Sequence, residues 1–87
     1  MTRIEKIRAA LEAALAPAEI IIEDENHLHT GHAGAAKGHG HFRVTVISAA
    51  FAGQPLLARH RRVYAALGAL MQTDIHALSI NARTPQE

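Results

Sequence analysis

The chain of 87 residues contains no cysteine and no tryptophan, and it has only two phenylalanines and one tyrosine. The lack of cysteine excludes a disulfide framework, a thiolate zinc site and a cysteine nucleophile. Any metal ligands of this chain must therefore be histidine or carboxylate side chains. The scarcity of aromatic rings leaves Ile, Leu and Val to build the core, and it argues against recognition of single-stranded nucleic acid by base stacking.

Long apolar runs are also lacking. No run approaches the ~20 residues of a membrane-spanning helix, and the N-terminal stretch carries charges where a signal peptide is apolar. The formal net charge of +1 is too small for a general nucleic-acid-binding surface. Phosphate-binding loops, dinucleotide fingerprints and Ser–His–Asp spacings are lacking too. We therefore expect a cytoplasmic protein that is neither membrane-bound nor an enzyme.

Apolar side chains recur with helical and strand periods along what we expect to be a single domain, residues 1–87. Thr2 and Glu5 form a capping-box pattern before the first helical stretch, and Pro17 cannot continue that helix. The order of elements predicts an α+β fold, αββαβ, or αββααβ where the second helix is broken near Ala58, with the helices packed on one face of a three-stranded sheet. The expected elements are a helix over 3–16, strands over 19–24 and 41–48, a helix over 55–71 that breaks near Ala58, and a strand over 75–82.

A histidine- and glycine-rich loop, residues 26–40, separates the first two expected strands. Loops of this length inside a small domain are usually functional or disordered. Its residues His27, His29 and His32 follow an H-x-H-x-x-H spacing, and imidazole is a good ligand for zinc, copper, nickel and iron. A solvated loop with incidental metal affinity explains this spacing equally well.

Three histidines lie outside this loop. His76 shares strand parity with Leu78 and Ile80, so we expect its ring to lean toward the packed face of the sheet. It is either a half-buried residue hydrogen-bonded to the backbone or a metal ligand held rigidly at the strand end. We expect His41, at the start of its strand, to be structural and His60 to lie in the core.

The second helical stretch places Leu56 and Tyr64 on its expected buried face and a basic cluster on its flanks. Such a cluster is usually a solvated face, but it can also contact a phosphate backbone or an acidic partner. The candidates for contact with a partner or with nucleic acid are Arg59, Arg61 and Arg62.

Several short strings, in this order along residues 4–84, together resemble the signature of the BolA family. Each string alone is weakly specific, but their combination covers nearly the whole chain. The strings are DEN at 24–26, HFRV at 41–44, F-x-G at 51–53, RHRRVY at 59–64 and IHAL at 75–78.

The resemblance implies a fold similar to class II KH domains and a partnership with monothiol glutaredoxins in iron–sulfur cluster trafficking and iron homeostasis. It implies that His76 is similar to a ligand of a [2Fe–2S] cluster, shared with the glutaredoxin and a glutathione. The second ligand would come from the loop, where His29 fits best by position, followed by His32, with His27 as an alternative. Imidazole ligation of one iron is chemically sound, as in Rieske centres, and raises the reduction potential.

Other members of the family are linked to transcription. The resemblance therefore also supports an alternative function, a DNA-binding transcriptional regulator that uses the KH-like fold and the helix at Arg59–Arg62. With so few arginines, we expect such binding to be weak and to fall steeply with added salt.

Overall fold

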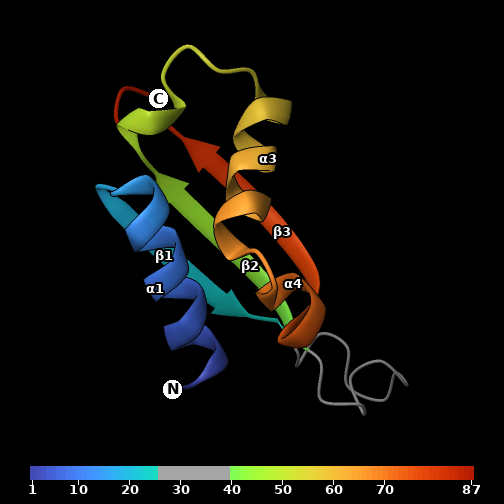
Figure 1. Ribbon diagram of the computed structural model, residues 1–87. Helices are drawn as coiled ribbons and strands as arrows, with labels where there is room; N and C mark the ends of the chain where they lie inside the picture. Colours follow the sequence, from blue (N-terminus) through green and yellow to red (C-terminus); the bar gives the residue numbers. More distant parts are fainter. Residues whose placement is uncertain (26–39) are drawn as a thin grey trace.

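The computed structural model describes residues 1–25 and 40–87. The order of elements in this part confirms the predicted α+β fold with the order αββααβ (Figure 1). The elements are α1 (Arg3–Leu15), β1 (Glu19–Asp24), β2 (Gly40–Ile47), a 3-10 turn η2 (Ala49–Phe51), α3 (Leu56–Leu67), α4 (Leu70–Thr73) and β3 (Ile75–Arg83).

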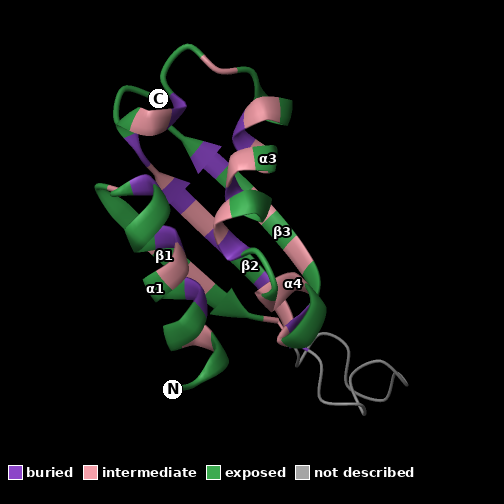
Figure 2. Ribbon diagram, viewed as in Figure 1, coloured by how far each residue is buried: buried purple, intermediate pink, exposed green. Residues whose placement is uncertain are grey.

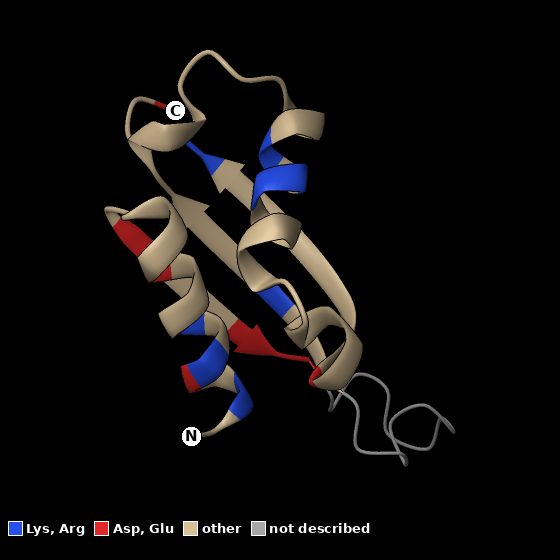
Figure 3. Ribbon diagram, viewed as in Figure 1, with Lys and Arg blue, Asp and Glu red and all other residues tan. Residues whose placement is uncertain are grey.

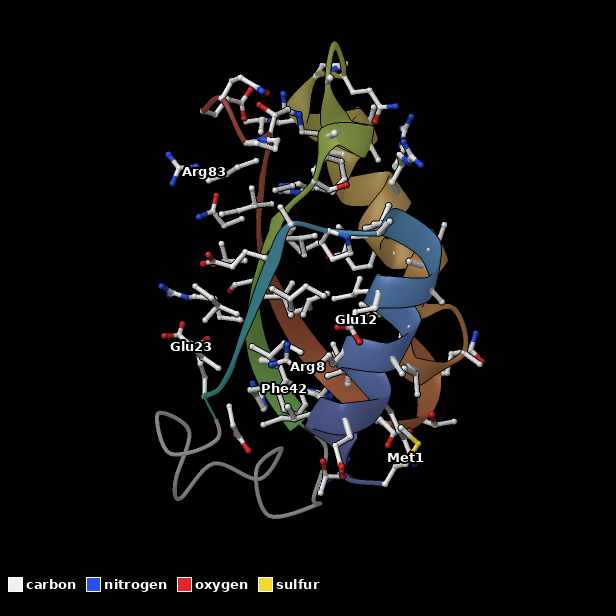
Figure 4. The ribbon with its side chains drawn as sticks, turned by 90° about the vertical axis from the view of Figure 1, so that its left-hand side faces the viewer. Met1, Arg8, Glu12, Glu23, Phe42 and Arg83 are labelled. Carbon is white, nitrogen blue, oxygen red and sulfur yellow. The ribbon has the colours of Figure 1, made fainter. Side chains whose placement is uncertain are left out.

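The described strands form one mixed sheet in the order β1-β2-β3. Strand β1 pairs with β2 antiparallel, and β2 pairs with β3 parallel. The helices α1 and α3 lie next to each other over one face of this sheet, as predicted (Figure 1). No helix of the described residues covers the opposite face, and Figure 4 shows Glu23 and Arg83 pointing away from the helices on that side.

The core lies between the helices and the covered face of the sheet (Figure 2). The central strand β2 alternates as its sequence predicts, with every second side chain buried against the helices. Burying these apolar side chains is the main favourable term in folding a chain of this size. The buried core residues are Ile7, Leu11, Leu15, Phe42, Val44, Val46, Phe51, Val63, Leu67, Ile75 and Ala82.

Helix α1 begins with the predicted capping box. The backbone N–H of Glu5 donates to Thr2 Oγ1 over 3.1 Å, and that of Thr2 donates to Glu5 Oε1 over 2.8 Å. The hydrogen bond from Thr2 holds the pKa of the Glu5 carboxyl below its usual range. The helix ends at Leu15, followed by Ala16 with a φ of 41°. None of the described helices has both the length and the apolarity to span a bilayer.

Helix α3 differs from the sequence prediction in two respects. It runs unbroken through Ala58, and Gly68, with a φ of 52°, ends it before α4 begins. The break expected near Ala58 was therefore wrong, because the residue able to adopt the required conformation lies ten positions later. Leu56 and Tyr64, expected to be buried, are 64% and 43% exposed.

Candidate functional site

An irregularity in the pairing of β2 with β3 determines how His76 is presented. Gly40 pairs with Ile75, but the next residue, His41, pairs with Ala77, so His76 is one extra residue in β3. Such a bulge changes which face the neighbouring side chains occupy. Ile75 is consequently 3% exposed in the core, while His76 is exposed to solvent. The prediction that the His76 ring leans toward the packed face was wrong for this reason.

The ring of His41 lies beside that of His76. The two ring centroids are 5.1 Å apart, and the ring planes are inclined by 53°. His41 is half-buried. Strand parity describes each histidine separately, so the pair was not predicted from the sequence. Both residues are near the start of their strands, and parallel neighbouring strands start at the same edge of a sheet. Their shared position at the strand starts was the feature of the sequence from which the pair could have been predicted.

Residues on both sides of the loop are anchored next to this pair. The N–H of Glu25 donates to the carbonyl oxygen of His41 over 2.7 Å, and the N–H of Gly40 donates to that of Asp74 over 3.3 Å. A hollow of about 180 Å³ beside His41 is also lined by Glu25 and Ala77. The Glu25 carboxylate itself lies 3.3 Å from Nε of Arg43. The edge of the sheet that carries the two imidazoles is therefore where the loop connects.

The carboxylate of Asp74, which immediately precedes β3, is held by the N-terminal part of α1. It accepts from Thr73 Oγ1 over 2.6 Å, and its Oδ2 lies 3.3 Å from Lys6 Nζ and 3.8 Å from Arg3 Nε. The hydrogen bond from Thr73, together with the two cations, holds the pKa of Asp74 below its usual range. This network fixes the backbone at the start of β3.

The loop histidines His27, His29 and His32 lie outside the described residues. Within residues 1–25 and 40–87, no three His, Asp or Glu side chains are grouped so that they could hold a metal ion. His60, expected in the core, is half-buried on α3.

The guanidinium of Arg59 is occupied within the protein. It is 8% exposed, and it donates from Nε to the carbonyl oxygen of Gln54 over 2.8 Å and from Nη1 to that of Ala82 over 3.1 Å. It also makes two hydrogen bonds to the Glu87 carboxylate, of 2.6 and 2.8 Å. The expectation that Arg59 contacts a partner is therefore corrected: its side chain joins α3 to the end of β3 and to the C-terminal residues.

The other two arginines of α3 are more accessible than Arg59. Figure 3 shows in blue where the basic residues lie along α3. Arg61 is exposed, and Arg62 is half-buried with Nη1 donating to the carbonyl oxygen of Ala50 over 2.8 Å. Only Arg61 is thus on the surface in the way that the sequence analysis expected.

Comparison with known proteins shows which family this chain resembles over most of its length. The family described as BolA-like protein matches residues 11–87. The chain is 43% identical over 89 residues to Protein BOLA1, chloroplastic, of Arabidopsis thaliana, covering 98% of this chain and 55% of that protein. It is 35% identical over 83 residues to the DNA-binding transcriptional regulator BolA of Escherichia coli (strain K12), covering 95% and 76%.

A solved structure agrees with the observed fold. The BolA domain of SufE1 from Arabidopsis thaliana is 40% identical, with a TM-score of 0.85 over 99% of this chain and 95% of that chain. The chain spans just over half the length of the Arabidopsis BOLA1 protein. Because that relative is named as chloroplastic, the cytoplasmic location expected from the sequence stays a prediction.

Proposed function

This chain belongs to the BolA family, and we propose that it is a non-enzymatic adaptor that binds a monothiol glutaredoxin and helps to ligate a shared [2Fe–2S] cluster. The cluster would be cargo in iron–sulfur cluster trafficking and iron homeostasis. Histidines of this chain would bind one iron, and the glutaredoxin cysteine and a glutathione would bind the other.

The observation that carries this proposal is the exposed imidazole of His76 on a rigid strand end. The residue before it, Ile75, is buried in the core, and the carboxylate of Asp74 is tied to α1. A metal ligand benefits from such support because its position is set before the metal arrives. His76 therefore combines accessibility to a partner with a fixed backbone.

The available donor groups suit the cluster. Two imidazoles on one iron are the ligand set of Rieske [2Fe–2S] centres, and they raise the reduction potential relative to four thiolates. A cluster held in this way would differ in its visible spectrum from one held by thiolates alone. Transfer of the cluster between the two ligand environments is thus a change that spectroscopy can follow.

The second ligand is proposed from the loop, with His29 first, His32 next and His27 as the alternative. His29 is four residues after Glu25, whose N–H is bonded to His41. The support for His29 is this short separation in sequence from the edge of the sheet that carries His76.

The experiment that tests the proposal is a visible circular dichroism titration of a [2Fe–2S]-loaded monothiol glutaredoxin, anaerobic and with glutathione. We expect the wild-type chain to produce a new spectrum that saturates at equal amounts of the two proteins. The His76→Ala variant should stay folded without producing it, whereas His60→Ala should behave as the wild type. An unchanged response from His76→Ala would rule out His76 as a ligand.

A second candidate function is DNA binding. It is favoured by the exposed Arg61 on α3 and by the relative from Escherichia coli that is named as a DNA-binding transcriptional regulator. Binding through so few cations should fall steeply with salt. A labelled duplex titrated at low ionic strength tests it: Arg61→Glu and Arg62→Glu should weaken binding, and no binding by the wild type would remove this candidate.

A further inference from the structure

His41 and His76 are brought together by the backbone of two adjacent strands. Strand β2 supplies His41, and the bulge in β3 supplies His76 at the same edge of the sheet. The neighbouring residues Phe42 and Ile75 are 2% and 3% exposed, so the strand segments that carry both imidazoles are fixed in the core. The proximity of the rings is therefore a property of the folded sheet, present without a partner.

The distance between the rings suits a shared ion. Two imidazoles that bind one tetrahedral ion through bonds of about 2.0–2.1 Å have ring centres roughly 5 Å apart. The observed separation of the ring centroids is 5.1 Å. The inclination of 53° is far from a face-to-face stack, so stacking does not account for the closeness of the two rings.

From this geometry we propose that His41 and His76 form a binding site for a single divalent transition-metal ion, of which Zn²⁺ is the test case. Neutral imidazole suits zinc, copper and nickel, whereas magnesium and calcium require oxygen ligands. Water would complete the coordination on the exposed side of His76. The proposed site uses only residues of two strands.

The site has a consequence for His76. Because one imidazole nitrogen cannot bind two metals, a zinc ion held here would compete with ligation of the cluster. That consequence rests on the proposed function, but the zinc site itself does not. Its test therefore uses this chain alone, without glutaredoxin or cluster, so failure of one proposal leaves the other standing.

The experiment is a titration with zinc chloride, followed by NMR of the imidazole ring nitrogens. We expect the ring signals of His41 and His76 to change together with one dissociation constant, while those of His60 stay constant. Replacing His41 or His76 by Asn should weaken zinc binding by at least about tenfold. Loss of a group that only supports a metal ligand already weakens metal binding by about tenfold or more, and loss of the ligand itself should cost no less.

A variant of the loop distinguishes zinc binding by His41 and His76 from incidental zinc binding by the loop histidines. With His27, His29, His32 and His39 all replaced by Asn, the joint response of the two strand histidines should persist with the same dissociation constant. Loss of that response in the loop variant, or a response of His76 without His41 in the wild type, would overturn the proposal. If His41→Asn does not fold, the His41 ring signals of the loop variant decide the question.

Discussion

The two ends of β3 carry the two groups of residues that the sequence singles out, and they are built in opposite ways. At the end of the strand, the Arg59 guanidinium is buried and makes four hydrogen bonds, to Gln54, Ala82 and Glu87. At its start, the His76 imidazole is exposed. The Arg59 side chain is engaged within the protein, whereas the His76 side chain reaches solvent.

This difference shows why residue type alone is a poor guide to a binding surface. A guanidinium has five donors in a fixed fork, which makes it as suitable for joining backbone carbonyls and a carboxylate inside a protein as for contacting a partner. His76 costs little stability where it lies, because the bulge leaves its side chain in solvent. The proposed function therefore rests on the histidine end rather than on the arginine end.

Gly40→Ala should have the largest effect, because it disturbs the packing under the histidine end. A Cβ at Gly40 would overlap the ring of Phe42, which is buried. Overpacking of this kind costs about 1–3 kcal/mol, so we expect the free energy of unfolding in urea to fall by this amount.

A double-mutant cycle identifies the cause. Phe42→Leu shortens the side chain that the new methyl group meets, so the combined variant should be less destabilised than the sum of the two single variants. Additive effects would mean that the overlap with Phe42 is not the source of the cost.

Arg59→Met tests whether the arginine end is structural. It removes the donors that serve two carbonyl oxygens and the Glu87 carboxylate, so the midpoint of thermal unfolding should fall by several degrees. The matched control is Arg61→Met, at the exposed position of the same helix, which should change the stability by no more than about 0.5 kcal/mol. Equal losses of stability in Arg59→Met and Arg61→Met would contradict a structural role for Arg59.

Acid should weaken the contact between Arg59 and Glu87. The hydrogen bonds from Arg59, followed by that from the Thr84 N–H, lower the pKa of Glu87 to about 2. A lowered carboxyl pKa stabilises the folded state above the unfolded value of about 4.3, and that stabilisation is lost as the pH falls through the folded value. The difference in unfolding midpoint between the wild type and Glu87→Gln should thus be largest near neutral pH and shrink toward pH 2. A constant difference across this range would contradict the contact.

His76→Ala should have the smallest effect on stability, within about 0.5 kcal/mol, because the side chain is exposed. Chemical unfolding of this variant and of the wild type at the same pH measures the difference. A substantial loss of stability would mean that His76 holds the strand end together, and the cluster titration would then have to be interpreted with a substitution that keeps the fold.

The regular elements were predictable because their signals are local. Alternation in residues 41–48 and the Thr2–Glu5 capping box are visible within a few positions, and the family resemblance supplied the fold. The bulge at His76 was not predictable, because parity arguments assume unbroken pairing with β2. The partner of Arg59 was also hidden, since Glu87 lies 28 positions away in a tail without a pattern.

The candidate site was predicted in part. The residues themselves were named from the sequence, but their surroundings were not. His76 was expected to lean toward the packed face and is exposed, while Arg59 was expected at the surface and is buried. The role of His76 as a cluster ligand and the choice of His29 over His32 stay predictions.

An amide NMR titration of this chain with a [2Fe–2S]-loaded monothiol glutaredoxin would show which end of β3 contacts the partner. The assignment of function to the histidine end predicts that signals of His41, His76 and Ala77 shift or broaden first, while those of Arg59 and Arg83 stay constant. Changes confined to α3 and the end of β3, with the histidine end unaffected, would contradict it.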